Sequence, residues 1–131
     1  MAPPVYLDYN ATTPVAPEVV EAMLPFLHEA FGNPSSSHGF GLRAREAVQE
    51  ARTQVAALVG CAPADIIFTG CATEANNLAL LGVARAAERA GRRHLVVSAV
   101  EHPAVLAPAR ELERRGWALT VVPVDAHGRV A

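Results

Sequence analysis

Apolar residues recur at helical spacing in four stretches of the chain. They predict helices that begin near Pro17, over residues 40–59, over residues 73–90 and over residues 103–115. Gly60 stands where the second of these helices would end. In the first helix the apolar side chains form one stripe, which we expect to be buried: Val19, Val20, Met23, Leu24 and Leu27.

Short apolar runs between the later helices predict β-strands. They are Ile66–Thr69, His94–Ser98 and Ala118–Pro123. A run that is apolar on both faces suits a strand buried in a largely parallel sheet. Strand, helix, strand, helix, strand is the order of an open α/β sheet with right-handed crossovers, so we predict an α/β fold.

Composition narrows the class of protein. The 131 residues are 51% apolar and 18% charged, which is typical of one soluble globular domain. The net charge of −2 gives no reason to expect a nucleic-acid partner. We find no signal peptide and no apolar run of about 18 residues, so we expect a cytoplasmic protein without a membrane partner. The spacing of Cys61 and Cys71 matches no zinc site, and we predict no metal.

A candidate anion site lies in the turn Thr69-Gly70-Cys71-Ala72-Thr73-Glu74. Its small residues let the backbone approach a ligand closely. The first turn of the following helix offers unpaired N–H groups and a partial positive charge. Thr73 can cap the helix or donate its hydroxyl to a phosphate oxygen. Such turns occur in every α/β fold, so a plain cap without a ligand stays open.

His102 occupies a comparable place after the next predicted strand, directly before Pro103. Ligands of open α/β sheets bind beyond the carboxyl ends of the strands. Because proline keeps the preceding residue out of helical geometry, the imidazole could project over a bound planar cofactor. Taken alone, the pattern favours an ordinary capping or surface histidine.

Four segments occur in a characteristic order: Leu7–Pro14, Phe31–Ser36 with His38 and Gly41, Phe68–Asn77 and Glu101–Leu106. Together they resemble the N-terminal part of the NifS/IscS-type cysteine desulfurases, which belong to the class V aminotransferase family of pyridoxal-phosphate enzymes. The resemblance covers essentially the whole chain. It implies the N-terminal part of the type I fold of pyridoxal-phosphate-dependent transferases, an open, mostly parallel sheet flanked by helices. Residues 1–16 would form an N-terminal arm of the small domain, and residues 17–131 an incomplete cofactor-binding large domain.

The resemblance also implies roles for individual residues. Ala72 and Thr73 match the positions that bind the phosphate of pyridoxal 5′-phosphate. His102 matches the histidine that stacks on the pyridine ring and takes part in acid/base catalysis. The loop of residues 33–41, with His38, would lie near the mouth of the active site, and Asn10 belongs to a segment that approaches it.

The turn departs from the commoner family form, in which serine and glycine precede the Ala-Thr pair. Gly70 removes a hydroxyl, and Cys71 replaces a glycine. A position near the positive end of a helix favours a thiolate at Cys71, but we expect a packed small thiol there. We expect Cys61, after Gly60, to be a small structural residue, and neither cysteine stands where the family's nucleophile belongs.

The family's reaction converts L-cysteine to L-alanine and transfers the sulfur to an enzyme cysteine as a persulfide, for iron–sulfur cluster or thio-cofactor assembly. The implied partners are L-cysteine, a sulfur-acceptor or scaffold protein, and a second copy in a homodimer. Selenocysteine lyase, another class V aminotransferase and a truncated non-catalytic paralogue are the alternatives.

The set of basic residues argues against enzymatic activity of this chain by itself. All 11 are arginine, and the sequence contains no lysine. Pyridoxal-phosphate enzymes hold their cofactor covalently on a lysine amine, and a guanidinium stays protonated and cannot replace it. We therefore expect the lysine and the persulfide cysteine to lie beyond residue 131, and the chain alone to be inactive.

Overall fold

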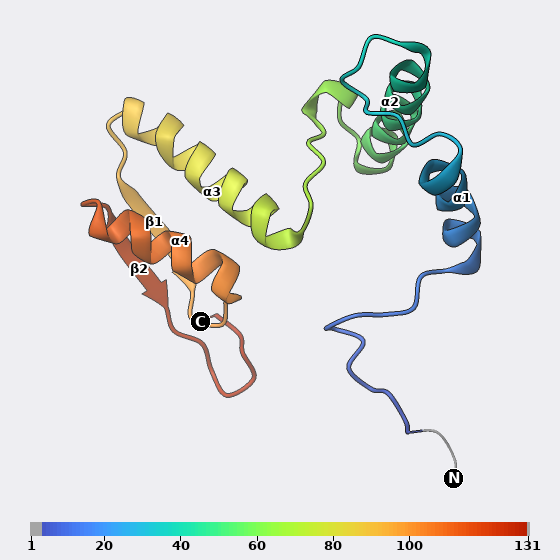
Figure 1. The fold of residues 1–131 in the computed structure, drawn as a ribbon. Helices are drawn as coiled ribbons and strands as arrows, with labels where there is room; N and C mark the ends of the chain where they lie inside the picture. The colour runs from blue at the N-terminus through green and yellow to red at the C-terminus, as the bar shows by residue number, and fades with distance from the viewer. Residues whose placement is uncertain (1–3, 131) are drawn as a thin grey trace. The chain divides into compact units, whose positions relative to one another are not determined.

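The computed structural model describes residues 4–130. The chain divides into two compact units, Met1–Ile67 and Phe68–Ala131. The boundary between them lies inside the predicted large domain, and the predicted division at residue 16 stays a prediction. The elements run in the order α1 (Pro17–His28), α2 (Gly39–Val59), the 3₁₀ helix η1 (Pro63–Asp65), α3 (Ala72–Arg89), β1 (His94–Ser98), α4 (Pro103–Arg114) and β2 (Ala118–Val122) (Figure 1).

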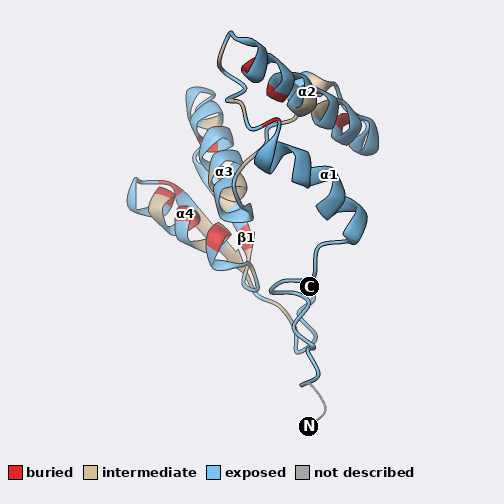
Figure 2. Cartoon of the chain, turned by 45° about the vertical axis from the view of Figure 1, so that its right-hand side comes forward, coloured by how far each residue is buried: buried red, intermediate tan, exposed pale blue. Residues whose placement is uncertain are grey.

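Helix α1 begins at Pro17 as predicted, with Glu18 in its first turn. Its apolar stripe is exposed, from 42% at Val20 to 70% at Leu27, and α1 contains no buried residue (Figure 2). The prediction of a buried stripe is therefore wrong for this structure. Helical periodicity identifies a face suited to burial, but burial also needs a second surface against that face.

Helix α2 is preceded by a tightly packed loop. Arg45 donates from Nε to the carbonyl of Pro34 at 2.8 Å and from its NH2 group to the carbonyl of Ser36 at 3.2 Å. A Cβ on Gly41 would lie 2.5 Å from the Ser36 oxygen, so this position has no room for a side chain. The helix ends at Gly60, whose φ of 74° lies in the left-handed region, as predicted.

The strand predicted over residues 66–69 does not form. These residues adopt no regular secondary structure, and Ile67 is 68% exposed. A strand needs a partner for its N–H and C=O groups, and within residues 4–130 the sheet consists of β1 and β2. The carbonyl of Ile66 instead accepts a hydrogen bond from the Arg52 guanidinium.

The second unit confirms the predicted α/β class. Strands β1 and β2 are parallel, with His94 opposite Ala118 and Ser98 opposite Val122. Helix α4 connects the two strands, packs on both, and also contacts α3 (Figure 1). The small core of this unit is a cluster of buried Ala84, Leu112 and Trp117, with Leu80, Ala87 and Leu95 around them. Val97, Ala104 and Ala109 are buried outside this cluster.

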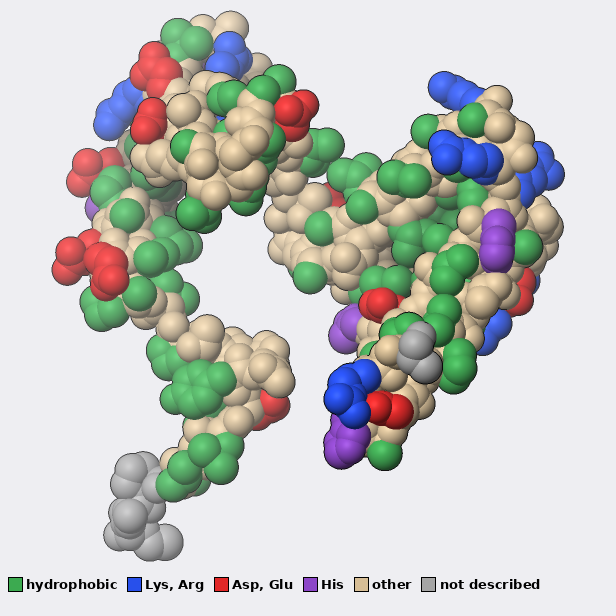
Figure 3. All heavy atoms as spheres, turned by 180° about the vertical axis from the view of Figure 1, so that it is seen from behind, with side chains coloured by type: hydrophobic (Ala, Val, Ile, Leu, Met, Phe, Trp, Pro, Cys, Tyr) green, Lys and Arg blue, Asp and Glu red, His purple; other side chains and the backbone are tan. Residues whose placement is uncertain are grey.

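Much of the apolar surface in both units is exposed, as the green side chains in Figure 3 show. On β1, for example, Val96 is 56% exposed while its neighbour Val97 is buried. None of the helices within residues 4–130 has the length and apolar character needed to cross a bilayer.

Candidate functional site

The predicted phosphate turn leads directly into α3. Cys71 is the N-cap, with extended backbone and no side-chain cap bond, so Ala72 and Thr73 are the first two residues of the helix. The interpretation of Thr73 as the cap is therefore wrong, because the helix begins one residue earlier than predicted. Thr73 is exposed, and its hydroxyl makes no hydrogen bond to any residue of the described range 4–130. The hydroxyl is available to a ligand beside the first-turn N–H groups, which no helix satisfies internally.

Three side chains fix the backbone of this turn. The Thr69 hydroxyl donates to the carbonyl of Cys71 at 3.3 Å. The N–H of Gly70 donates to Glu74 Oε2 at 2.7 Å, and Asn77 Nδ2 donates to the carbonyl of Thr73 at 2.9 Å. Glu74 belongs to the predicted turn but was given no role of its own, and Asn77 was not among the residues predicted for the site. The available signal was a glutamate in the first turn of a predicted helix, where this residue commonly bonds backbone N–H groups near the cap.

His102 is the N-cap of α4. Its φ of −62° and ψ of 149° are extended, as expected for a residue that precedes proline. Its Nδ1 accepts a hydrogen bond from the N–H of Ala104 at 3.0 Å. Because Nδ1 is the acceptor, the proton of the neutral imidazole belongs on Nε2. The capping interpretation is confirmed, and the stacking role stays a prediction that this geometry permits.

Thr73 and His102 line the same cavity, of about 490 Å³, between α3 and α4. The cavity is lined by Thr73, Asn77 and Leu81 of α3 and by His102, Pro103, Ala104, Ala107, Pro108, Glu111 and Arg114 at the start of α4 and along it. Its size is in the usual range for small-molecule pockets. Ala72 contributes no lining side chain, so any role in binding would fall to its backbone N–H.

The other end of this cavity carries opposite charges. Glu111 pairs with Arg114 at 2.6 Å and with Arg115 Nε at 2.7 Å. The hydrogen bond from Arg115, followed by the charge of Arg114, lowers the pKa of Glu111 from its usual 4.5. These ions lie toward the C-terminal end of α4, whereas Thr73 and His102 lie at helix N-termini.

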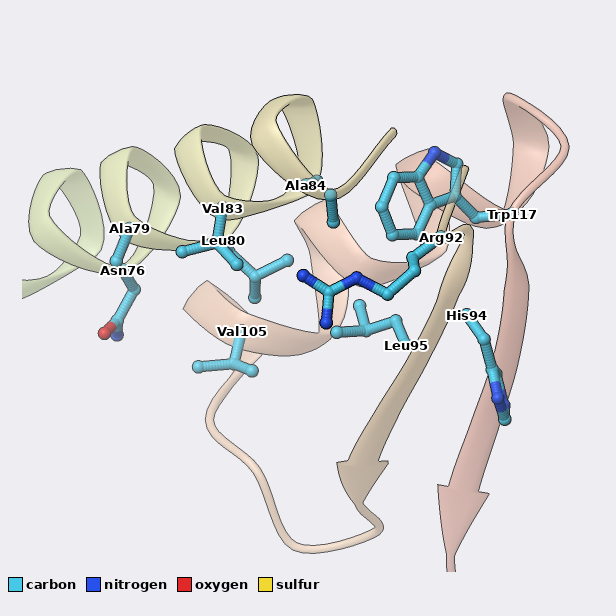
Figure 4. A pocket seen from close by; sticks show the side chains of 11 residues that line it. Asn76, Ala79, Leu80, Val83, Ala84, Arg92, His94, Leu95, Val105 and Trp117 are labelled. Atoms are coloured by element: carbon cyan, nitrogen blue, oxygen red, sulfur yellow. The ribbon is translucent and has the colours of Figure 1, made fainter. Parts of the chain in front are cut away.

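A second cavity, of about 500 Å³, is mostly apolar and is lined by neither Thr73 nor His102. The guanidinium of Arg92 lies between Leu80 and Leu95, and His94 lies at the edge of the cavity (Figure 4). Its lining includes Ala84, Trp117 and other members of the small core. It is therefore the open side of that core, and we do not assign it as the predicted site.

The remaining predicted site residues belong to the first unit. His38 is the N-cap of α2: its Nδ1 accepts from the N–H of Gly41 at 3.4 Å, and its ring meets Phe40 edge-on with centroids 6.4 Å apart. Asn10 lies in a turn beside Tyr6, whose hydroxyl donates to the carbonyls of Asp8 at 2.8 Å and Thr12 at 3.2 Å. Their expected closeness to the active site stays a prediction.

Cys61 and Cys71 are both free and exposed. The expectation of a packed thiol at Cys71 is therefore wrong, since this residue is exposed at the N-cap of α3. Cys61 likewise has no buried packing role. Within residues 4–130, no group of three or more His, Cys, Asp or Glu side chains is arranged to hold a metal ion.

Comparison with known proteins identifies the family. The family model "Aminotransferase class-V" matches residues 5–131, nearly the whole chain. The chain belongs to the class-V aminotransferase family.

Relatives of this class-V aminotransferase chain are named as desulfurases. It is 52% identical over 126 residues to "Cysteine desulfurase IscS" of Dictyoglomus turgidum, covering 96% of this chain and 32% of that protein. It is 48% identical over 125 residues to "Cysteine desulfurase IscS 1" of Archaeoglobus fulgidus, covering 95% of this chain and 32% of that protein. The chain thus spans about a third of the length of these relatives.

Solved structures support the fold assignment. A structure named "NIFS-LIKE PROTEIN" superposes with a TM-score of 0.89 at 42% identity, over 97% of this chain and 35% of that one. Another, named "SspA in complex with cysteine", has a TM-score of 0.81 at 39% identity, over 90% and 34% of the two chains. The fold is therefore that of the N-terminal part of NifS-like enzymes.

Proposed function

We propose that this chain is the N-terminal segment of a pyridoxal-phosphate-dependent cysteine desulfurase. Such an enzyme takes sulfur from L-cysteine and leaves L-alanine. The observation that carries the proposal is the shared cavity of Thr73 and His102, on a chain about 50% identical to proteins named cysteine desulfurase.

The first turn of α3 fits the phosphate of pyridoxal 5′-phosphate. The N–H groups of Ala72 and Thr73 and the free Thr73 hydroxyl would bind its oxygens, with the positive end of the helix behind them. The residues of this chain cannot hold the cofactor covalently, because the sequence contains no lysine to form the bond. The chain supplies the phosphate and ring contacts, and a lysine from elsewhere would supply the tether.

His102 fits the face of the pyridine ring. With Nδ1 engaged by the Ala104 N–H, Nε2 is the atom that would hold or pass a proton near the substrate. When bound, the cofactor supplies an electron sink for the carbon centre of the amino acid. In the net reaction an enzyme thiolate takes the sulfur atom as a persulfide, and the carbon that carried it gains a proton to become the methyl group of alanine.

The wider assignments follow from the same proposal. We propose L-cysteine as the substrate, and the structurally similar SspA is known in complex with cysteine. A homodimer, a sulfur-acceptor or scaffold protein, iron–sulfur cluster assembly and a cytoplasmic location are parts of the proposal that rest on family resemblance.

The cofactor site is tested on the 131-residue chain by thermal unfolding with added ligand. Pyridoxal phosphate should raise the melting temperature by mass action, and pyridoxal without phosphate should raise it less. Thr73→Val, which removes the hydroxyl at nearly constant volume, should reduce the shift, whereas Thr73→Ser should keep it. An equal shift for Thr73→Val and wild type would contradict the phosphate role of Thr73.

The desulfurase assignment is tested by replacing the matching third of the Dictyoglomus turgidum relative with this chain. We expect the purified chimera to form alanine from L-cysteine, and His102→Asn to lower the rate. A soluble chimera that binds the cofactor but forms no alanine would overturn the assignment. Alanine from L-selenocysteine alone would favour a selenocysteine lyase.

A further inference from the structure

Glu74 reaches back over the N-cap of α3. It is the third residue of the helix, and its Oε2 accepts the N–H of Gly70 at 2.7 Å. In the usual capping box, a glutamate at this position bonds the N–H of the N-cap residue itself. Here the bond reaches one residue further, so the side chain closes a ring around Cys71, Ala72 and Thr73.

The N-cap residue itself does not hold the backbone of the turn through its side chain. Cys71 makes no side-chain cap bond, so its thiol does not fix the turn. A Cβ on Gly70 would lie 3.3 Å from Glu74 Oε2, which shows how closely the carboxylate approaches the glycine. The Thr69 hydroxyl adds only a longer bond of 3.3 Å, to the carbonyl of Cys71.

We propose that Glu74 is a positioning residue of the phosphate turn. By holding the Gly70 N–H, it fixes the path of the backbone through residues 70–73, so that the Ala72 and Thr73 N–H groups and the Thr73 hydroxyl meet one anion. The inference rests on the proposed function in taking that anion to be the phosphate of pyridoxal phosphate.

The part of Glu74 that matters is its reach and not its charge. An anionic side chain in a first helical turn stabilises the helix, but it also repels a phosphate bound at the same end. A glutamine of equal length can still accept the Gly70 N–H through its amide oxygen without that repulsion. An aspartate keeps the charge, but its side chain is one methylene too short.

Two variants of the 131-residue chain separate these contributions. In Glu74→Gln, the Gly70 amide should exchange hydrogen at the wild-type rate, and pyridoxal phosphate should bind at least as tightly as it does to wild type. In Glu74→Asp, exchange at Gly70 should accelerate and binding should weaken roughly threefold to tenfold, the effect of losing one ordering hydrogen bond. Glu88→Gln, at the other end of α3, should change neither quantity.

Inorganic phosphate distinguishes this inference from the proposed function. If wild type binds phosphate with the predicted variant order, but binds pyridoxal phosphate no better than pyridoxal, the proposed function fails and the role of Glu74 stands. If Glu74→Asp binds pyridoxal phosphate as tightly as wild type, or Gly70 exchanges equally in both, the role of Glu74 is overturned and the proposed function stands. Failure of wild type to bind either ligand overturns both.

Discussion

Thr73 in the first turn of α3 and His102 at the N-cap of α4 line one cavity. Each residue lies where a helix begins, and the two side chains can contact one ligand bound in this cavity. The proposed phosphate contact of Thr73 and the proposed ring contact of His102 both require that the two residues share a cavity.

His102 has a structural role that can be separated from its proposed catalytic role. Because its Nδ1 accepts the Ala104 N–H, His102→Ala should destabilise the chain by about 0.5–2 kcal/mol. His102→Asn should destabilise the chain much less than His102→Ala, because asparagine is a good N-cap. It still removes the imidazole. Urea unfolding followed by the fluorescence of Trp117 measures the difference. Equal destabilisation by both substitutions would show that the cap is not the source of the effect.

Two glycines in the first turn of α2 provide a matched test of backbone packing. A Cβ on Gly41 would lie 2.5 Å from the Ser36 oxygen and 2.7 Å from the Asn33 oxygen, whereas a Cβ on Gly39 would meet nothing within 4 Å. Gly41→Ala should therefore displace the loop and destabilise the chain by about 1–3 kcal/mol.

Gly39→Ala should be neutral or slightly stabilising, because alanine is the better helix former. The two variants can be compared by their circular dichroism melting curves, and by protease cleavage within residues 33–38. A Gly41→Ala chain that resists cleavage as well as Gly39→Ala would refute the close approach.

The small core around Trp117 should dominate the stability of the second unit. Leu112 is 5% exposed, so Leu112→Ala should cost about 2–5 kcal/mol through lost burial and the cavity left behind. Leu58, which is 85% exposed, provides the control, and Leu58→Ala should be close to neutral. Denaturant midpoints for the two variants measure the contrast, and similar midpoints would mean that this core does not hold the unit together.

Glu111 should make stability depend on pH in one direction. Its pKa is lowered by the hydrogen bond from Arg115 and by the charge of Arg114, so the folded state favours the carboxylate. Glu111 therefore contributes to the stability of the folded state at pH values above its unfolded pKa, near the usual 4.5. This contribution is lost as the pH falls through the lower pKa of the folded state.

Wild type should therefore exceed Glu111→Gln in stability at about pH 7, and the gap should narrow as the pH falls below 4.5 toward the lowered pKa of folded Glu111. High salt should also narrow the gap, because these ions are exposed and screened. Glu21→Gln, which removes a carboxylate from α1, is the comparison variant for the loss of one negative charge. A gap that persists unchanged in acid would contradict this assignment.

Local signals predicted most of the secondary structure. Pro17, Gly60 and Pro103 mark helix boundaries because proline and glycine act on the backbone at their own positions. The strand expected over Ile66–Thr69 fails for the opposite reason. Its apolar character suits a buried strand, but a strand exists only through hydrogen bonds to another segment.

The sequence by itself determined the starts of α1 and α4, the non-helical backbone of His102 before Pro103, and the absence of any lysine. These depend on the chemistry of single residues and their immediate neighbours. Tertiary structure decided the rest: the α1 stripe is exposed, Cys71 is the cap in place of Thr73, and Thr73 shares a cavity with His102. Burial and cavities are made by surfaces that meet in space, and one-dimensional periodicity cannot say which surfaces meet.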